Sequence, residues 1–136
     1  MALGTGRKLT EGEVVFRLGE EAKGVFLVLG GRVNLTLPIS LDGRQEDILV
    51  EERVEGQLLG WSGLVPPHRF TLQAKAPVAT ELLFIPRAEL EALFVQVPEV
   101  AAGIYGNLAR IIGQRLQVFQ AMWVRSVQRG MAHGRG

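Results

Sequence analysis

The sequence contains no cysteine and only two histidines among its 136 residues. Without thiols, disulfide bridges, thiol catalysis and cysteine-ligated metal sites are excluded. No apolar run approaches the roughly 20 residues that a membrane-spanning helix needs. The stretch from Met1 to Arg7 also lacks the apolar core of a secretion signal. We therefore expect a cytoplasmic protein with no membrane contact.

The residue types that usually carry enzyme chemistry are scarce or scattered. His68 and His133 lie far apart in the sequence, whereas a metal-binding jelly-roll enzyme of the cupin kind needs several histidines and a carboxylate on neighbouring strands. No P-loop, G-x-S-x-G or G-x-G-x-x-G stretch occurs. Most acidic residues fall in turns or at predicted helix ends. We therefore expect no enzymatic activity, no catalytic residue, no metal and no cofactor.

Length and composition indicate a single globular domain covering residues 1–136. Hydrophobic residues make up 47% of the chain and the formal net charge is +1, so there is no general electrostatic attraction to nucleic acid. The charge is uneven, because five arginines and no acidic residue occur from Arg110 onward. This basic end indicates either an acidic partner or a solvated helix face.

Residues from about 8 to 86 are predicted to form short β-strands separated by turns. Gly30-Gly31 and Asp42-Gly43 are typical of tight hairpin turns, and Pro38 is expected to close the third strand. Many short strands with frequent turns are typical of a sandwich, jelly roll or barrel. The strands are expected at residues 14–18, 24–29, 32–37, 45–53, 70–74 and 80–85.

Residues from about 87 to 129 are predicted to be helical, and residues 130–136 to form a flexible tail. Pro86 precedes a short helix, and Pro98 opens a long one with two apolar stripes. One stripe can cover the rest of the chain and the second needs another partner, for which a second copy of the chain is the simplest choice. A helix buried within its own domain is the alternative. The stripe expected at a homodimer interface contains Tyr105, Ala109, Ile112, Leu116, Phe119 and Trp123.

The segment from residue 56 to 76 has the features of a ligand site. Gly60 and Gly63 permit close backbone approach, and the residues from Trp61 to Leu64 can form one helical turn whose N–H groups attract an anion. Arg69 follows a stiff Pro-Pro turn and can direct its guanidinium to the same place. Arg69 as an exposed loop residue is the alternative.

Five segments give the chain a resemblance to the cyclic nucleotide-binding domains of Crp–Fnr type bacterial regulators, from about Leu9 to Gln128. The resemblance implies a mainly β fold with a C-terminal α part: an eight-stranded jelly-roll (double-stranded β-helix) barrel, a short helix and a long dimerisation helix. The segments are Leu9–Phe16, Gly24–Val33, Gly56–Gly60, Leu83–Arg87 and Arg115–Gln117.

The phosphate-binding cassette departs from the pattern of that family. Trp61 stands where the family has a ribose-binding Glu, and Phe70 stands where it has Ser or Thr. Trp61 can stack on a ligand or plug the pocket, and loss of buried polar groups predicts weak or altered binding. The ligand-binding residues that the resemblance implies are Gly60, Trp61, Ser62, Gly63, Arg69, Phe70, Thr71 and Phe119.

The resemblance therefore implies a ligand-sensing regulatory domain that signals through its long helix. Its expected ligand is a cyclic nucleotide or another phosphate-bearing small molecule. Few residues follow Arg129, where family members carry a helix-turn-helix, so no direct DNA binding is expected. Two alternatives stay open: a ligand-free dimerisation or scaffold module that docks a protein partner, and a truncated Crp-type regulator that acts with a DNA-binding partner.

Overall fold

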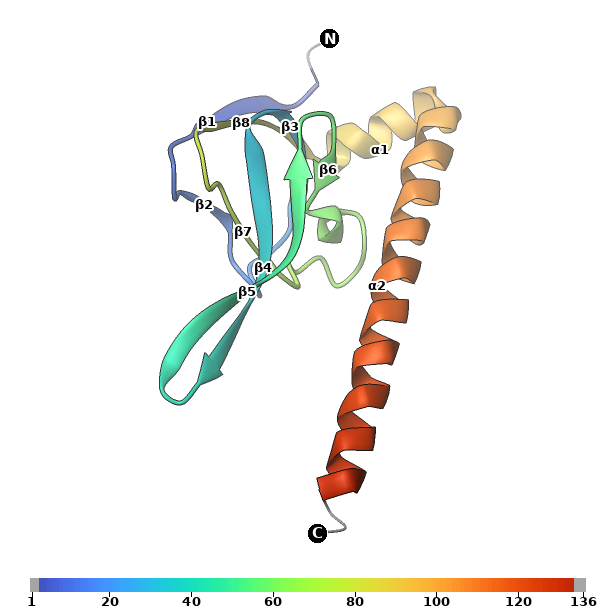
Figure 1. Cartoon of the computed structure of the whole chain (residues 1–136). Helices are drawn as coiled ribbons and strands as arrows, with labels where there is room; N and C mark the ends of the chain where they lie inside the picture. The colour runs from blue at the N-terminus through green and yellow to red at the C-terminus, as the bar shows by residue number, and fades with distance from the viewer. Residues whose placement is uncertain (1–2, 134–136) are drawn as a thin grey trace. The chain divides into compact units, whose positions relative to one another are not determined.

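A computed structural model describes residues 3–133 of the chain. The chain divides into two compact units, Met1–Val95 and Gln96–Gly136. The first unit contains the strands and all but the last residue of the first helix (Figure 1). Its strands are β1 Thr5–Leu9, β2 Val14–Phe16, β3 Gly24–Gly30, β4 Arg32–Leu41, β5 Arg44–Val54, β6 Leu58–Leu59, β7 Gln73–Lys75 and β8 Thr80–Pro86.

The strands form two four-stranded antiparallel sheets. One sheet has the order β1-β8-β3-β6 and the other has the order β2-β7-β4-β5. This arrangement confirms the expected mainly β jelly-roll fold followed by helices. The apolar side chains that the two sheets share form the core, to which Leu9, Val15, Phe16, Ala22, Phe26, Val28, Val33, Leu35, Leu59, Phe70, Ala74, Ala76 and Leu82 contribute.

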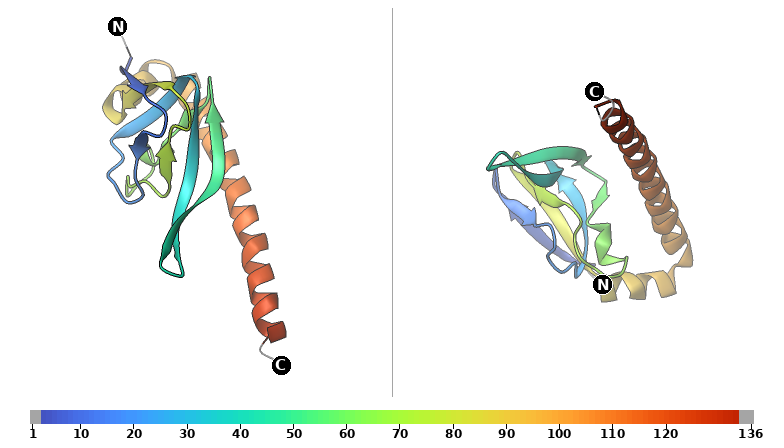
Figure 2. Two further views of the ribbon diagram at one scale, coloured as in Figure 1. Left: turned by 60° about the vertical axis from the view of Figure 1, so that its left-hand side comes forward. Right: turned by 90° about the horizontal axis from the view of Figure 1, so that it is seen from below.

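Glycine and aspartate make the two predicted hairpin turns. Gly31 alone separates β3 from β4 and has φ of 82°, which favours glycine. Asp42 and Gly43 connect β4 to β5 with φ of 50° and 77°, the pair of positive values that a type I′ turn requires. Beyond the rest of the barrel β4 and β5 continue together as a projecting hairpin (Figure 2).

Three of the differences from the predicted strand boundaries have a clear structural cause. Pro38 does not end β4, which continues to Leu41, because β7 pairs only with residues 34–36 and the proline needs no donor on that side. The barrel begins earlier than expected, since β1 pairs with β8 although it is rich in polar residues. The strand expected at 70–74 is β7 at Gln73–Lys75, because the backbone of Phe70 instead pairs with that of Gly19 and Glu20.

The helices begin at or near the predicted residues. Helix α1 spans Arg87–Gln96 and helix α2 spans Pro98–His133, so residues 130–133, expected in the tail, are helical. The remaining tail residues, 134–136, lie outside the described part of the chain. Within residues 3–133, no helix has the length and apolar character needed to cross a membrane.

Candidate functional site

The predicted cassette begins with a glycine that no other residue would replace easily. Gly60 has φ of 74° and follows β6, directly before the 3-10 helix η1, Trp61–Gly63. A Cβ atom at Gly60 would lie 3.2 Å from the ring of Phe26, 3.3 Å from Phe70 and 3.4 Å from Phe16. Conformation and close packing therefore both select glycine at this turn.

The second predicted glycine of the cassette lies against the main chain of β3. A Cβ atom at Gly63 would lie 2.1 Å from the carbonyl oxygen of Gly24, and a Cβ atom at Gly24 would lie 2.1 Å from that of Ile85. The two glycines thus allow η1, β3 and β8 to approach each other closely. Ser62, which precedes Gly63, is also buried.

Two side chains hold the cassette loop to its neighbours. Arg87, the first residue of α1, donates from Nη1 to the carbonyl oxygens of Ala22 at 3.0 Å and Gly63 at 2.9 Å. His68 Nδ1 lies 3.1 Å from the carbonyl oxygen of Ser62. The His68 contact therefore closes the loop on itself, and the Arg87 contacts connect the start of the loop to the start of α1.

Phe70, at the position of the family's Ser or Thr, is a core residue. Its side chain is 7% exposed, and its ring stacks on that of Phe16 with the centroids 3.7 Å apart. Phe16 in turn lies 5.8 Å from Phe26, between ring centroids. Trp61 is half-buried. Aromatic packing thus occupies the barrel interior beside Gly60.

Arg69 is held at the surface. Its Nη1 donates to the carbonyl oxygen of Gly19 at 3.0 Å, in the loop between β2 and β3, and its side chain is exposed, as is that of Thr71. Phe119 belongs to α2, in the second unit, and its side chain is exposed. Among the predicted ligand residues of the first unit, the structure therefore brings Gly60 and Phe70 together and ties Arg69 to a different loop.

Sequence reasoning missed a partly buried ion pair on β5. Nη2 of Arg53 lies 2.7 Å from Oε1 of Glu51, and the side chains are 8% and 31% exposed. Strict alternation from Ile48 and Val50 would place both charges on the outer face. A bulge breaks that alternation, because Glu51 pairs with Leu35 but the next pair joins Leu49 to Thr36. The run Glu51-Glu52-Arg53 contained no signal of this shift.

The described residues do not form a metal site. Within residues 3–133, no group of three or more histidine, cysteine, aspartate or glutamate side chains is placed to hold an ion. The first unit offers instead a close-packed glycine turn, the half-buried Trp61 beside buried aromatic rings, and arginine side chains. These groups are suited to binding a small anionic or planar molecule.

Comparisons with known proteins agree with this geometry. A family model described as the cyclic nucleotide-binding domain matches residues 6–96. The catabolite activator protein of Thermus thermophilus is similar with a TM-score of 0.76 and 25% identity, over 88% of this chain and 55% of that chain. A transcriptional regulator of Thermotoga maritima, with a TM-score of 0.71 and 18% identity over 84% of this chain and 89% of that chain, shares the fold.

One curated protein is also similar. The patatin-like phospholipase domain-containing protein 7 of Rattus norvegicus is 29% identical over 117 residues, which are 81% of this chain and 8% of that protein. The chain thus spans a small part of that relative, and 55% of the Thermus thermophilus structure.

Proposed function

Because the chain belongs to the cyclic nucleotide-binding domain family, we propose that it is a non-enzymatic regulatory domain that senses a cyclic nucleotide or another phosphate-bearing small molecule. The observation that carries this proposal is the main chain of the cassette. Gly60 adopts a left-handed conformation and leads directly into η1, and Gly63 packs against β3. This left-handed turn and the close packing behind it support the proposal, although Trp61 and Phe70 replace polar partners.

Arg69 is the cassette's own partner for the phosphate in this proposal. To reach a ligand, its guanidinium must exchange the carbonyl oxygen of Gly19 for a phosphate oxygen. The present bond joins a charged guanidinium to a neutral carbonyl oxygen, whereas a bond to phosphate joins opposite charges and can be bidentate, which makes it the stronger of the two. The exchange is therefore favourable once an anion is present.

Helix α2 is the element proposed to transmit ligand binding, because it is also the proposed dimerisation helix. A ligand can shift the helix only if it binds one arrangement more tightly than the other. The apolar stripe proposed for the dimer seam is exposed in the single chain, which leaves it available to a second copy. Its members are Tyr105, Ala109, Ile112, Leu116, Phe119 and Trp123.

Thermal unfolding in the presence of nucleotides tests the proposal. The purified chain is heated with cyclic AMP, cyclic GMP and cyclic dinucleotides, each up to millimolar concentration. A ligand at about 100 times its dissociation constant stabilises the folded state by roughly 2.7 kcal/mol, which gives a clear rise in melting temperature. Arg69→Ala is expected to reduce this rise, and Arg44→Ala, at the tip of the β4–β5 hairpin, serves as the control.

A scaffold module is the second candidate function. The stacked core position of Phe70 favours it, because an apolar ring replaces a polar ligand contact. This alternative predicts that no nucleotide raises the melting temperature at millimolar concentration and that Arg69→Ala has no effect. That result would refute the sensor proposal and favour a domain that only dimerises and docks another protein.

A further inference from the structure

Arg53 is buried on the inner face of β5, and Glu51, whose side chain is 31% exposed, lies on the same face. In the register of β4 and β5, Arg53 lies opposite Val33 and Glu51 lies opposite Leu35. Side chains directly opposite each other point to the same face of a sheet, and Val33 and Leu35 both belong to the core. Arg53 is accordingly only 7% exposed. A charged pair thus stands where the barrel pattern calls for apolar residues.

The same face leads across the sheet to the cassette. Leu35 pairs with Glu51 on one side and with Ala74 of β7 on the other, and Ala74 pairs with Phe16 of β2. Phe16 carries the stacked ring of Phe70. Neighbouring strands lie about 4.8 Å apart, so three strand steps place Glu51 roughly 14 Å from Phe16. Arg53 therefore shares one continuous inner surface with the aromatic side chains around Gly60.

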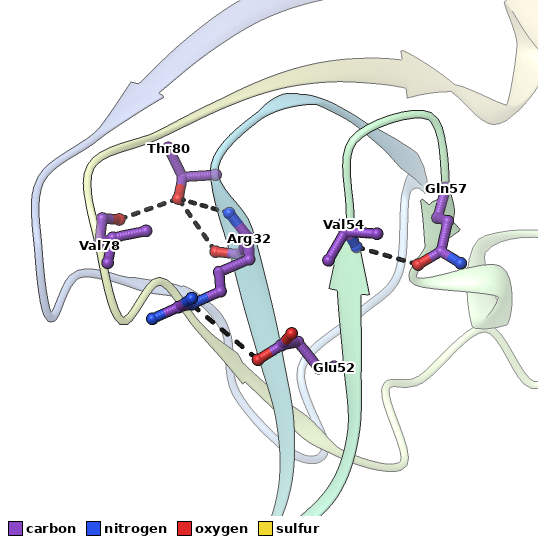
Figure 3. A network of polar contacts seen from close by, with 6 residues as sticks. All are labelled: Arg32, Glu52, Val54, Gln57, Val78 and Thr80. Atoms are coloured by element: carbon purple, nitrogen blue, oxygen red, sulfur yellow. Dashed lines mark hydrogen bonds and ion pairs between the residues drawn. The ribbon is translucent and has the colours of Figure 1, made fainter.

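Stability does not explain a charge pair at this place. Replacing a buried ion pair by apolar side chains of similar volume is often neutral or stabilising, because desolvation offsets the attraction between the charges. The neighbouring ion pair, which joins β4 to β5, is different. Arg32 and Glu52 point outward, lie 3.9 Å apart and are 48% and 47% exposed (Figure 3). The inner pair therefore needs a reason other than folding.

We infer that Arg53 binds the phosphate group of the ligand inside the barrel, an inference that rests on the function proposed above. Glu51 is the ion-pair partner that fixes the orientation of the Arg53 guanidinium. A guanidinium has five N–H donors in a planar fork and can serve a carboxylate and a phosphate together. In a buried position a charge-assisted hydrogen bond is stronger than at the surface, where Arg69 lies. Arg53 thus supplies from β5 the polar contact that the cassette lacks at Trp61 and Phe70.

Calorimetric titration of three variants tests this inference. The wild-type chain, Arg53→Met, Arg53→Lys and the surface control Arg32→Met are titrated with the cyclic nucleotide that gives the largest thermal shift, and with its phosphate-free nucleoside. Arg53→Met is expected to weaken nucleotide binding at least tenfold. Arg53→Lys keeps the positive charge but lacks the planar guanidinium, and it is expected to weaken nucleotide binding three- to tenfold. Neither is expected to change nucleoside binding, and Arg32→Met is expected to bind as the wild type does.

The outcomes separate this inference from the function on which it rests. If the wild type binds a nucleotide and Arg53→Met binds it equally well, the role of Arg53 is refuted and the sensor function stands. If the wild type binds no nucleotide, both are refuted. Far-UV circular dichroism without ligand shows whether each variant folds. If Arg53→Met does not fold, Arg53→Lys decides, and unchanged nucleotide affinity in that variant overturns the inference.

Discussion

Substitution of Gly63 by alanine tests whether η1 is packed against β3 as described. Gly63 does not have a positive φ, so the effect of Gly63→Ala is steric. The new Cβ atom would lie 2.1 Å from the carbonyl oxygen of Gly24 and 2.4 Å from its carbonyl carbon. Gly24 cannot retreat, because its own Cα faces the main chain of Ile85 in β8. Overpacking typically costs about 1–3 kcal/mol, and three main-chain segments in contact place this variant near the upper end.

Urea unfolding and thermal melts measure the effect. A loss of about 3 kcal/mol corresponds to a fall in melting temperature of roughly 10 °C for a chain of this size. The urea m-value is expected to stay unchanged, because the unfolded chain exposes the same surface. Gly6→Ala is the matched control, since a Cβ atom there meets nothing within 4 Å. If Gly63→Ala stays within about 0.5 kcal/mol of the wild type, as a neutral surface change does, the packing argument is wrong.

Two further substitutions address the barrel closure and the long helix. The buried hydroxyl of Thr80 accepts the N–H of Arg32 at 3.3 Å and lies 2.9 Å from its carbonyl oxygen, so Thr80→Val should lower the free energy of unfolding by about 1–2 kcal/mol. Equal urea midpoints for Thr80→Val and the exposed control Thr71→Val would contradict this. Leu116→Glu should convert a dimer to a monomer in light scattering, whereas Gln114→Glu, about 200° away around α2, should not. A dimer that survives Leu116→Glu would exclude this stripe as its seam.

The features that follow from local chemistry could be predicted from the sequence. Gly31, Asp42 and Gly43 all adopt the positive φ that their turns require, which is why the hairpins were found correctly. The helical turn at Trp61–Gly63 and the starts of α1 and α2 also depend on nearby residues. Such signals lie within a few positions of the structure they determine.

Features that depend on pairing between distant segments could not be predicted. β1 has little apolar character, and it forms a strand because its backbone pairs with that of β8. The bulge in β5 turns the side chains of Glu51 and Arg53 to the inner face of the sheet. Only the pairing register of β5 with β4 reveals this change. Alternation along a strand predicts the buried face only while the register is unbroken.

The cassette shows the same division between backbone and side chains. Gly60 and Gly63 were predicted as points of close approach, and both are. The direction of the Arg69 side chain depends on Gly19, which lies 50 residues earlier in the chain, and the burial of Phe70 depends on Phe16. Neither contact is encoded in the spacing of residues 56–76, so the orientation of these side chains required the structure.

These contacts together bear on where ligand selectivity would originate. A buried polar group discriminates between ligands because an unmatched ligand leaves it without a partner. Aromatic residues at positions 61 and 70 cannot supply that discrimination, since an apolar surface accepts many planar molecules. Arg53 can supply it under the proposed role, because an anionic ligand would gain a second charged contact beside the Glu51 ion pair, which a neutral ligand would not. Selectivity would then be set mainly by β5, and a change of residue 53 would alter the choice of ligand more than a change of residue 61.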